Sequence, residues 1–514
     1  ARLDRHQRKS AAVLKRKRTD LSRLLYRIRD LNELPFFSFP VHFADSSGET
    51  RFHVVLGNPP WVRAHRWSGL SRSRLKDRYR FLRNAGWRGG TKLAGTGRGF
   101  AAQADLSLLF LERGLELTRQ GGALGFLLPS KLIRCLAAGA ARERILRDTR
   151  ILRIEDCSLS TTRLFDATTY PLVLLVRREE PRDDAMIGVR VHDRRGDGID
   201  FQLAQTGLPL IANDPESPWV LAPPSVRSVF DRMCEAAPPL GAMPERRPSR
   251  GIFTGANAVF LGRPAGEHAP GTITLDLPVG RAVIERDLVR PVLRGEDLAA
   301  WRFRISRALV WPYDDEGRLL PTLPAATHHH LARHRRLLAR RIDLRSGQPY
   351  WTLFRVRSDK LASRVAWRDI APEPGAVVIP SRVPFLDGSV PIVSLNTVYQ
   401  VAAASGEDAY LLAAVLNSTV ARTYLRAIAE RASGGYFRFL GWTVALLPFP
   451  EKPDAAAAAR CVEIARRAHE TRRLDTDGHV RLDCAVGQLY GLTSEDLDTL
   501  RAFDSRLSKP RGKR

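Results

Sequence analysis

Blocks of hydrophobic and polar positions along the chain predict a succession of helices and strands. Residues 1–34 are basic and predict a helix with these apolar side chains near one face: Leu14, Leu21, Leu24, Leu25 and Ile28. A polar turn follows, and the apolar run within residues 52–56 predicts a short buried strand that breaks at Gly57. The glycine-rich stretch at residues 86–99 favours a flexible loop.

Residues 105–180 carry the pattern of an α/β unit. One helical stripe consists of Leu106, Leu109, Phe110, Gly114 and Leu117. It predicts a helix that ends at Gly121 and Gly122. The wholly apolar run ALGFLLPS predicts a strand with both faces covered, and a helix around residues 136–147 and the strand-like runs ILRIEDCSL and YPLVLLVRR follow it. Because strands alternate with helices, we expect an open, largely parallel sheet through about residue 180.

The rest of the chain changes in character. Residues 181–244 are polar and proline-rich, which predicts a linker with small elements. Residues 245–452 combine short strand candidates, turns and aromatic residues, which is typical of a mixed α+β domain. Residues 453–514 predict helices followed by a basic tail.

Composition adds a candidate partner. The 514 residues include 82 Lys and Arg against 55 Asp and Glu, a net charge of +27. Such an excess favours nucleic acid, although an arginine-rich composition with solvated faces would also explain many of the arginines. No apolar run reaches membrane-spanning length, so no membrane partner is expected. The five cysteines are scattered without a CxxC pair, which predicts reduced thiols in a cytoplasmic protein and no metal site.

The turn Asn58-Pro59-Pro60-Trp61, directly after the predicted strand, carries the candidate chemistry. The exocyclic amine of adenine is a poor nucleophile because its lone pair is delocalised into the ring. The side-chain oxygen of Asn58 and the backbone carbonyl of Pro59 can accept its two hydrogens, and the prolines hold these acceptors rigidly. Trp61 offers an aromatic face for a base turned out of the double helix. The alternative is a stiff loop in which Trp61 packs on a neighbouring domain.

The turn resembles the [DNS]-P-P-[YFW] motif of S-adenosylmethionine-dependent amino-methyltransferases, and the similarity extends along the chain. ADLSLLFLERGLELTRQGGALGFLLPSKLI and LFDATTYPLVLLVRR resemble the helix and strands that follow the catalytic loop in the Eco57I-like N6-adenine DNA methyltransferases of restriction-modification and phage-defence systems. GIFTGANAVFL, LVRPVLRGEDLAAW, VWPYDDEG, AYLLAAVLNS and LPFP resemble the recognition domain of that family, in order, and LDCAVGQLYGLTSED resembles its terminal helical segment.

The resemblance implies a fold and an activity. The fold is α/β, with a partial Rossmann-like methyltransferase sheet within residues 35–180, an α+β target-recognition domain within residues 245–452 and C-terminal helices. The implied reaction moves a methyl group from S-adenosylmethionine to adenine N6 at a specific site in double-stranded DNA. Asn58, Pro59, Pro60 and Trp61 would be the catalytic residues.

Two departures from the family pattern qualify this expectation. His53 stands where family members usually have an acidic residue. The D-P-x-x-G-x-G cofactor motif and the ribose carboxylate, which precede the catalytic turn in this class, match nothing in residues 1–57. We therefore expect the C-terminal portion of such an enzyme, which binds DNA and transfers no methyl group unless a separate N-terminal segment supplies the cofactor half. The alternative is a DNA-binding specificity module without catalysis.

Several polar residues of the recognition region are candidates for DNA contact: Thr254, Asn257, Arg263, Arg290, Arg294, Arg302 and Arg438. The loop that carries Arg431 and Arg438 could contact the DNA backbone or pack on the methyltransferase domain. Asn can pair with adenine and Arg with guanine in the major groove. For any single one of these residues, a structural role or a phosphate contact is favoured over base readout. No carboxylate–carboxylate–lysine cluster of a nuclease stands out, so DNA cleavage by this chain is not expected.

Overall fold

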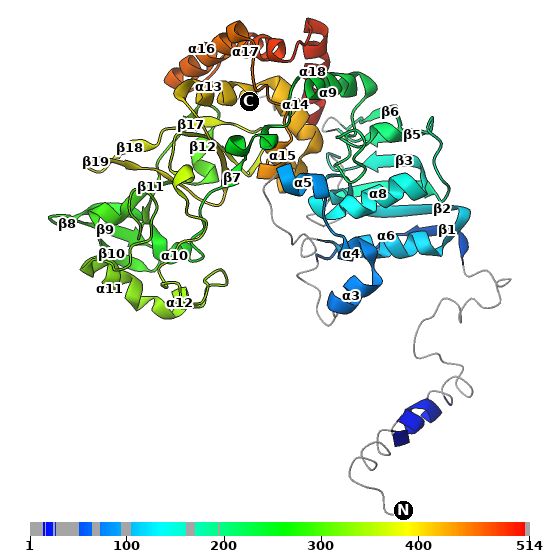
Figure 1. The fold of residues 1–514 in the computed structure, drawn as a ribbon, viewed down its shortest axis with the longest axis horizontal. Coiled ribbons are helices and arrows are strands. Elements are labelled where there is room, and N and C mark those ends of the chain that lie inside the picture. The colour runs from blue at the N-terminus through cyan, green and yellow to red at the C-terminus, as the bar shows by residue number, and fades with distance from the viewer. Residues whose placement is uncertain are drawn as a thin grey trace, which may run out of the picture.

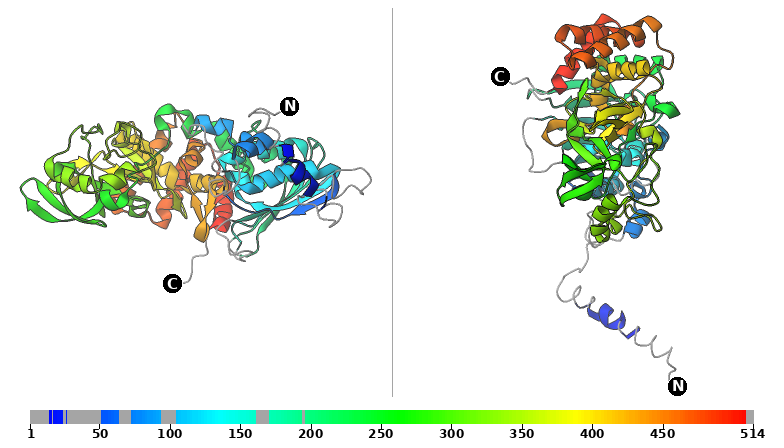
Figure 2. Two further views of the ribbon diagram at one scale, coloured as in Figure 1. Left: turned by 90° about the horizontal axis from the view of Figure 1, so that it is seen from below. Right: turned by 90° about the vertical axis from the view of Figure 1, so that its left-hand side faces the viewer.

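The computed structural model describes residues 14–15, 17–23, 26, 51–63, 72–93, 104–160, 170–193 and 196–508. The described part of the N-terminal segment is helical and exposed, in agreement with the expected basic helix, whereas Leu24, Leu25 and Ile28 lie outside the described residues. The body is elongated, with one large sheet at each end and a helical layer between them (Figure 1; Figure 2). In the part of the chain that the structure describes, no helix is long and apolar enough to cross a bilayer.

The first sheet contains six strands in the order β1-β2-β4-β3-β5-β6. Their bounds are β1 Phe52–Gly57, β2 Thr118–Pro129, β3 Arg150–Asp156, β4 Pro171–Arg177, β5 Met186–Val191 and β6 Ile199–Ala204. Only the β1–β2 and β3–β5 pairings are parallel among these strands; β4 runs antiparallel to both of its neighbours, and β6 is antiparallel to β5. The expected α/β fold is confirmed, but the expectation of a largely parallel sheet ending near residue 180 is wrong.

Helices flank this sheet or precede its strands. Their bounds are α3 Arg72–Arg78, α4 Arg80–Arg83, α5 Arg88–Leu93, α6 Leu106–Leu117, α7 Lys131–Arg134 and α8 Gly139–Asp148. Helix α6 ends at Leu117 and not at the glycines, because Thr118 already pairs with Phe52 of β1. Of the predicted buried stripe, Leu109 is buried, while Phe110 is 45% exposed.

The glycine-rich stretch is expected to be a loop, but its residues Arg88–Leu93 form a short helix, α5. Trp87 immediately before it is buried and donates from Nε1 to Asp214 Oδ2 at 2.6 Å. A Cβ atom on Gly90 would lie 2.2 Å from the Trp87 ring. The missing side chain therefore lets the helix pack directly against the indole, a tertiary contact that outweighs the low helix propensity of glycine.

The region after residue 204 builds a second six-stranded sheet and several smaller sheets. Helix α9 spans Pro224–Ala236, and the main sheet of the recognition region has the strand order β10-β9-β8-β14-β11-β20. Bounds in this part are β7 Ser249–Arg250, α10 Asn257–Phe260, β8 Leu261–Ala269, β9 Thr272–Leu277, β10 Gly280–Glu285, β11 Val289–Leu293, β12 Leu298–Ala299, β13 Arg302–Phe303, β14 Arg307–Val310, α11 Ala325–Arg333 and α12 Arg335–Ala339. They continue with β15 Arg364–Arg368, β16 Ile370–Ala371, β17 Val377–Ile379, β18 Arg382–Phe385, β19 Gly388–Pro391, β20 Val393–Ser394, β21 Val398–Ala402, β22 Glu430–Ala432 and β23 Tyr436–Arg438.

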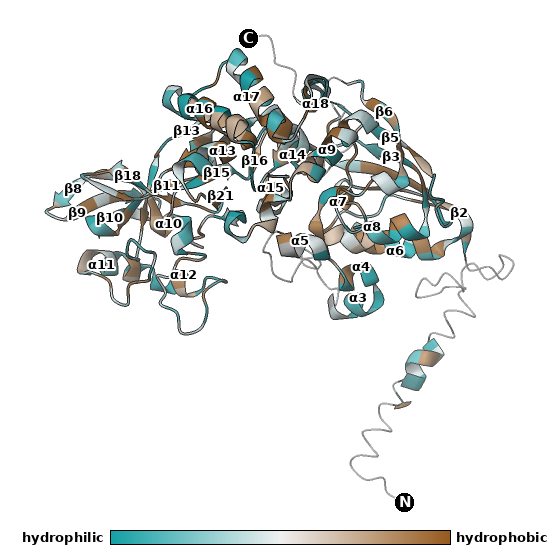
Figure 3. Cartoon of the chain, turned by 45° about the horizontal axis from the view of Figure 1, so that its top comes forward, coloured by the Kyte–Doolittle hydropathy of each residue, from teal (hydrophilic) through white to brown (hydrophobic). Residues whose placement is uncertain are grey.

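A helical layer joins the two ends of the molecule. It contains α13 Gly406–Asn417, α14 Thr419–Ile428, α15 Gly441–Ala445, α16 Ala455–Thr471, α17 Thr476–Leu489 and α18 Ser494–Leu507. Asp454, Asp475 and Thr493 cap the N-termini of the last three helices, as short polar side chains at this position do. Figure 3 shows hydrophobic segments within these helices and within the first sheet. One buried cluster unites Trp87 and Leu136 near the first sheet, Trp367 of β15 and Phe503 of α18.

Candidate functional site

The candidate turn lies at the edge of the first sheet where several strands end. The pairing directions make β1, β2, β3 and β5 run the same way, with β4 reversed between β2 and β3. The residues that follow their carboxyl ends are therefore on one edge: Asn58, Ser130, Cys157 and His192. The crevice at this edge is where open α/β sheets bind ligands.

Contacts on both sides hold the turn in place. Gly57 pairs with Phe126 of β2, and a Cβ atom on Gly57 would lie 3.0 Å from the Phe126 ring. After the turn, Val62 O accepts a hydrogen bond from Leu106 N at 2.8 Å, and Arg63 forms a β-bridge with Asp105. The backbone just after the turn is thus hydrogen-bonded to the first residue of α6, although α3, α4 and α5 lie between them in sequence.

Within the turn, exposure differs from residue to residue. Asn58 and Pro60 are exposed, Pro59 is buried and Trp61 is half-buried. The amide of Asn58 is accessible from solvent, the buried proline anchors the backbone, and the indole is not sealed in the interior. This arrangement suits an acceptor pair beside an aromatic face, and the catalytic roles of the four residues stay a prediction.

The outer edge of β1 departs from the expectation of a buried strand. Val54 is 57% exposed and Leu56 is 75% exposed. Strand β1 is the terminal strand of the sheet, and none of the strands that the structure describes pairs with its other edge. The described residues around Asn58 include no glycine-rich turn followed by a ribose carboxylate, so the described residues alone do not provide the expected cofactor motif.

A buried ion pair supports the same sheet edge. Arg134 of α7 donates to Asp156 Oδ2 at 2.5 Å, and their side chains are 2% and 0% exposed. Ser158 N donates to Asp156 Oδ1 at 3.0 Å, and Arg431 Nε donates to Ser158 Oγ at 3.2 Å. Burial opposes ionisation, yet the guanidinium groups of Arg134 and Arg431 and the Arg134 hydrogen bond hold the pKa of Asp156 below its ordinary value. Arg431 is thus buried and hydrogen-bonded to the residues that follow β3, which is one of the two placements that the sequence left open for its loop.

A group able to hold a metal lies farther along this edge. The ligand atoms of Glu155, Cys157 and His192 all lie within 4.8 Å of one another. Glu155 Oε1 and His192 Nε2 are 2.6 Å apart, and burial raises the pKa of the Cys157 thiol to about 12. Sequence reasoning, which expected no metal site, missed this group because strand pairing alone brings residues 155–157 beside residue 192.

Two predicted DNA contacts lie in the protein interior. Thr254 is fully buried; its hydroxyl donates to Asn257 Oδ1 at 2.6 Å, and its carbonyl accepts from Arg341 at 2.5 Å. Arg290 is 5% exposed and donates to Asp315 and to the carbonyl of Asp287. Both side chains are buried and hydrogen-bonded within the fold in this structure, and their role as DNA contacts stays a prediction.

The other predicted contacts are at least partly accessible. Asn257, Arg263 and Arg302 are exposed. Arg294 is 25% exposed and pairs with Glu296 and Asp297, and it lines a cavity of about 480 Å³ together with Asn257. Arg438 is 31% exposed and pairs with Asp369 at 2.7 Å. Asn257 and Arg294 therefore share one depression, whereas Arg438 lies in another part of the recognition region.

Comparisons with known proteins match the chain to restriction-modification methylases. The Eco57I restriction-modification methylase family matches residues 10–165, which include the candidate turn. The type II methyltransferase M.XhoI of Xanthomonas vasicola is 21% identical over 87% of this chain and 76% of its own length. The type II methyltransferase M.PaeR7I of Pseudomonas aeruginosa is 23% identical over 88% of this chain and 72% of its own length.

A solved structure extends the likeness to the fold of most of the chain. The type IIL restriction-modification enzyme MmeI, determined in complex with DNA, superposes with a TM-score of 0.56 at 12% identity. The superposition covers 88% of this chain and 56% of the MmeI chain. This chain thus spans little more than half of the length of that enzyme. Taken together, the family match and the two relatives show that the chain is similar to the Eco57I-like restriction-modification methyltransferases.

Proposed function

We propose that this chain supplies the adenine-binding side and the DNA-reading part of a site-specific DNA methyltransferase in a restriction-modification or phage-defence system. The reaction would transfer a methyl group from S-adenosylmethionine to adenine N6 in double-stranded DNA. The supporting observation is that Asn58 is exposed at the carboxyl end of β1, on a turn anchored by the buried Pro59 and inside the residues that match the methylase family.

The residues of the turn act on the target amine. An adenine turned out of the duplex lies against the indole of Trp61, and its amino group donates one hydrogen to Asn58 Oδ1 and the other to the carbonyl of Pro59. These acceptors draw the nitrogen toward a tetrahedral geometry in which its lone pair is free. Since the prolines fix the turn, the acceptors need little reorganisation as positive charge develops on the nitrogen.

S-adenosylmethionine, when bound, supplies the electrophilic methyl group. The open edge of β1, with Val54 and Leu56 exposed, supports the proposal that a further strand-bearing segment completes the cofactor side. The same observation favours the second candidate function, a DNA-binding specificity module that transfers no methyl group by itself. The reaction would take place in the cytoplasm, where the five cysteines, all free, stay reduced.

Two binding measurements on the full chain test this proposal. We expect a labelled DNA duplex to bind with an affinity that falls as salt rises, and we expect no saturable binding of radiolabelled S-adenosylmethionine. Tight cofactor binding by the chain alone would refute the divided site. Absence of duplex binding would refute both candidate functions.

A product assay distinguishes the two functions. The chain is combined with a cofactor-binding segment from a relative, and the methylated DNA is digested to nucleosides and separated by mass spectrometry. We expect N6-methyldeoxyadenosine. A methylated cytosine would refute adenine specificity. If none of the supplied segments gives a methylated product, the DNA-binding specificity module is the candidate function that remains.

A further inference from the structure

Helices α11 and α12 and the loop after them carry a dense set of arginines with few acidic neighbours. Residues 325–345 include six arginines and a single acidic residue, Asp343. Arg341 is buried, and the other five arginines are exposed: Arg333, Arg335, Arg336, Arg340 and Arg345. We call these five residues the arginine surface.

The arginine surface differs from neighbouring arginines in its pairing. Nearby Arg318 pairs with Asp314 at 2.9 Å, and Arg286 pairs with Glu267 at 2.8 Å. No ion pair involves any of the five guanidinium groups of the arginine surface among the residues that the structure describes; Arg335 instead lies 5.5 Å from the Tyr350 ring. Unpaired charges of one sign repel each other, and a polyanionic partner would relieve that repulsion.

The backbone beneath the arginine surface is firmly attached to the recognition sheet. The carboxylate of Glu285 in β10 accepts hydrogen bonds from the amides of Ala326 and Thr327 at the start of α11, each at 2.8 Å. His330 Nε2 lies 2.9 Å from the Val259 carbonyl oxygen, and Leu331 and Leu338 are fully buried. The exposed guanidinium groups therefore project from a fixed scaffold, which lowers the entropic cost of ordering them on a ligand.

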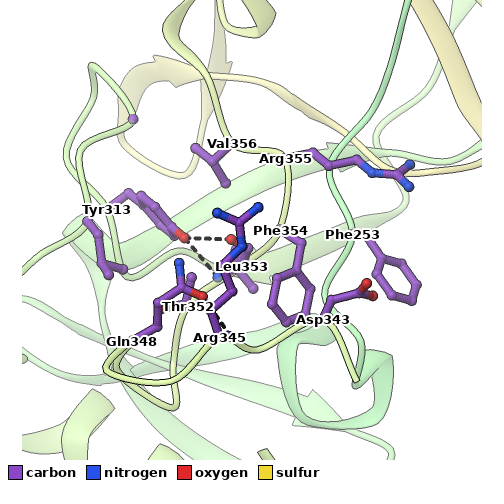
Figure 4. A pocket seen from close by; sticks show the side chains of 12 residues that line it. Phe253, Tyr313, Asp343, Arg345, Gln348, Thr352, Leu353, Phe354, Arg355 and Val356 are labelled. Carbon is purple, nitrogen blue, oxygen red and sulfur yellow. Dashed lines mark hydrogen bonds between the residues drawn. The ribbon is translucent and has the colours of Figure 1, made fainter. Parts of the chain in front are cut away.

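Arg341 links the segment of the arginine surface to the loop before α10, whose first residue is the predicted contact Asn257. Arg341 connects the two segments because it donates to the carbonyls of Thr254 and Tyr350, each at 2.5 Å. The backbones of Phe253 and Phe354 pair beside it, and their rings are 6.2 Å apart. Figure 4 shows these rings with Arg345 around a cavity of about 520 Å³. Positive charge and an accessible amide thus belong to one continuous part of the recognition region.

We propose that the arginine surface binds the sugar–phosphate backbone of double-stranded DNA and sets the position of the recognition region on the duplex. The proposal rests on the proposed function and adds the binding surface to it. Guanidinium groups bind phosphate oxygens through paired N–H donors, and three of them follow closely in the chain: Arg333 is the last residue of α11, Arg336 lies in α12 and Arg340 directly follows α12. Such contacts hold the protein in register and carry no sequence information.

The test compares two triple variants of the full chain that lose the same charge. The surface variant is Arg333→Gln, Arg336→Gln, Arg340→Gln. The control variant is Arg182→Gln, Arg281→Gln, Arg318→Gln, whose arginines are exposed and pair with Asp184, Asp276 and Asp314. Binding of two unrelated fluorescent duplexes is measured by anisotropy across a salt series, and thermal melting checks that both variants are folded.

We expect the surface variant to bind both duplexes at least tenfold more weakly, and the slope of log K against log salt to shrink by about 0.9 for each phosphate that is no longer bound. The control variant should bind within about twofold of the wild type, and replacement of the same three surface arginines by Lys should restore most of the slope. An equally weakened control variant would overturn the proposal, as would weaker binding of only one duplex or unchanged binding of both.

Two further outcomes separate this proposal from the proposed function. If the wild type and the surface variant bind the duplex equally well, only the role of the arginine surface is refuted. If the wild type does not bind the duplex, DNA binding itself is refuted. If an RNA duplex or an acidic peptide binds the wild type as tightly as DNA and depends on the same arginines, the assignment to double-stranded DNA is wrong.

Discussion

At the residue scale, burial separates the side chains that the fold uses from those that remain accessible to a substrate. Asn58 combines an exposed amide with a backbone held by Pro59 and by the pairing of Gly57. Arg290, in contrast, is surrounded by acceptors that satisfy its guanidinium group inside the protein. A buried arginine needs such partners, since an unpaired buried charge is strongly destabilising.

Replacement of Asn58 by Ala should reduce methylation at least 100-fold in the complex with a cofactor-binding segment, because one of the two acceptors for the amine is removed. The affinity for duplex DNA should stay within about twofold, since the arginine surface binds the DNA backbone. Transfer of tritiated methyl groups and fluorescence anisotropy measure the two effects. Replacement by Asp, which the [DNS]-P-P-[YFW] pattern allows, is the matched control and should retain activity. Equal reductions of methylation and DNA affinity in the Ala variant would contradict the assigned role.

At the element scale, the direction of strand pairing decides which residues meet. Strand β4 runs antiparallel between β2 and β3, and the carboxyl ends of β1, β2, β3 and β5 therefore share one edge. Both parallel and antiparallel inner strands are apolar on both faces when helices cover the sheet, so the apolar runs predict the strands and not their direction. The buried pair of Arg134 and Asp156 has no sequence signature either, because charged residues at strand and helix ends are usually solvated.

Protonation of Asp156 should destabilise the protein in acid. The pKa of Asp156 is lower in the folded protein than its ordinary value of 3.8, so its contribution to stability is present above about pH 4 and is lost as the pH falls through the folded pKa. Replacement by Asn should cost about 3–5 kcal/mol at pH 7, because it leaves Arg134 buried without a counter-charge, and should flatten the acid dependence. Urea unfolding at several pH values measures both effects.

The control for this prediction is Asp184→Asn, which breaks the exposed pair with Arg182. This variant should lose less than about 1 kcal/mol at pH 7 and keep the acid dependence of the wild type. An Asp156→Asn variant with wild-type stability at pH 7 would show that the buried pair does not support the sheet edge.

At the scale of the whole molecule, one hydrophobic cluster links segments that are far apart in sequence. Trp87 beside the first sheet, Trp367 of the recognition region and Phe503 of the last helix all belong to it. The helical layer is therefore part of the shared interior and not an appendage. This core connects the first sheet with the part of the recognition region around Trp367, whereas Leu331 and Leu338 beneath the arginine surface belong to a separate buried cluster.

Replacement of Phe503 by Ala should destabilise the entire body by about 3–5 kcal/mol, because its side chain is 4% exposed within the shared cluster. Tryptophan fluorescence during urea unfolding should shift to lower denaturant as one transition, since Trp87 and Trp367 report on the same core. Val480 in α17 is 45% exposed, and its replacement by Ala should change stability by less than about 0.5 kcal/mol. A loss of C-terminal helix content without a shift in tryptophan fluorescence would show that α18 unfolds independently.

Hydrophobic periodicity and local motifs were sufficient to predict β1, the turn after it, helix α8, strands β3 and β4 and the helical C-terminal segment, because each depends on residues close together in the chain. The same reasoning named Asn257 and Arg263 as candidate DNA contacts, and the structure shows that both are exposed. Only the tertiary structure decided the mixed direction of the first sheet, the exposure of Val54 and Leu56, the burial of Thr254 and Arg290, and the lack of ion pairs at the arginine surface in the described part of the chain. Strand direction, burial and pairing all depend on contacts between residues distant in sequence, and no local pattern encodes which of those contacts form.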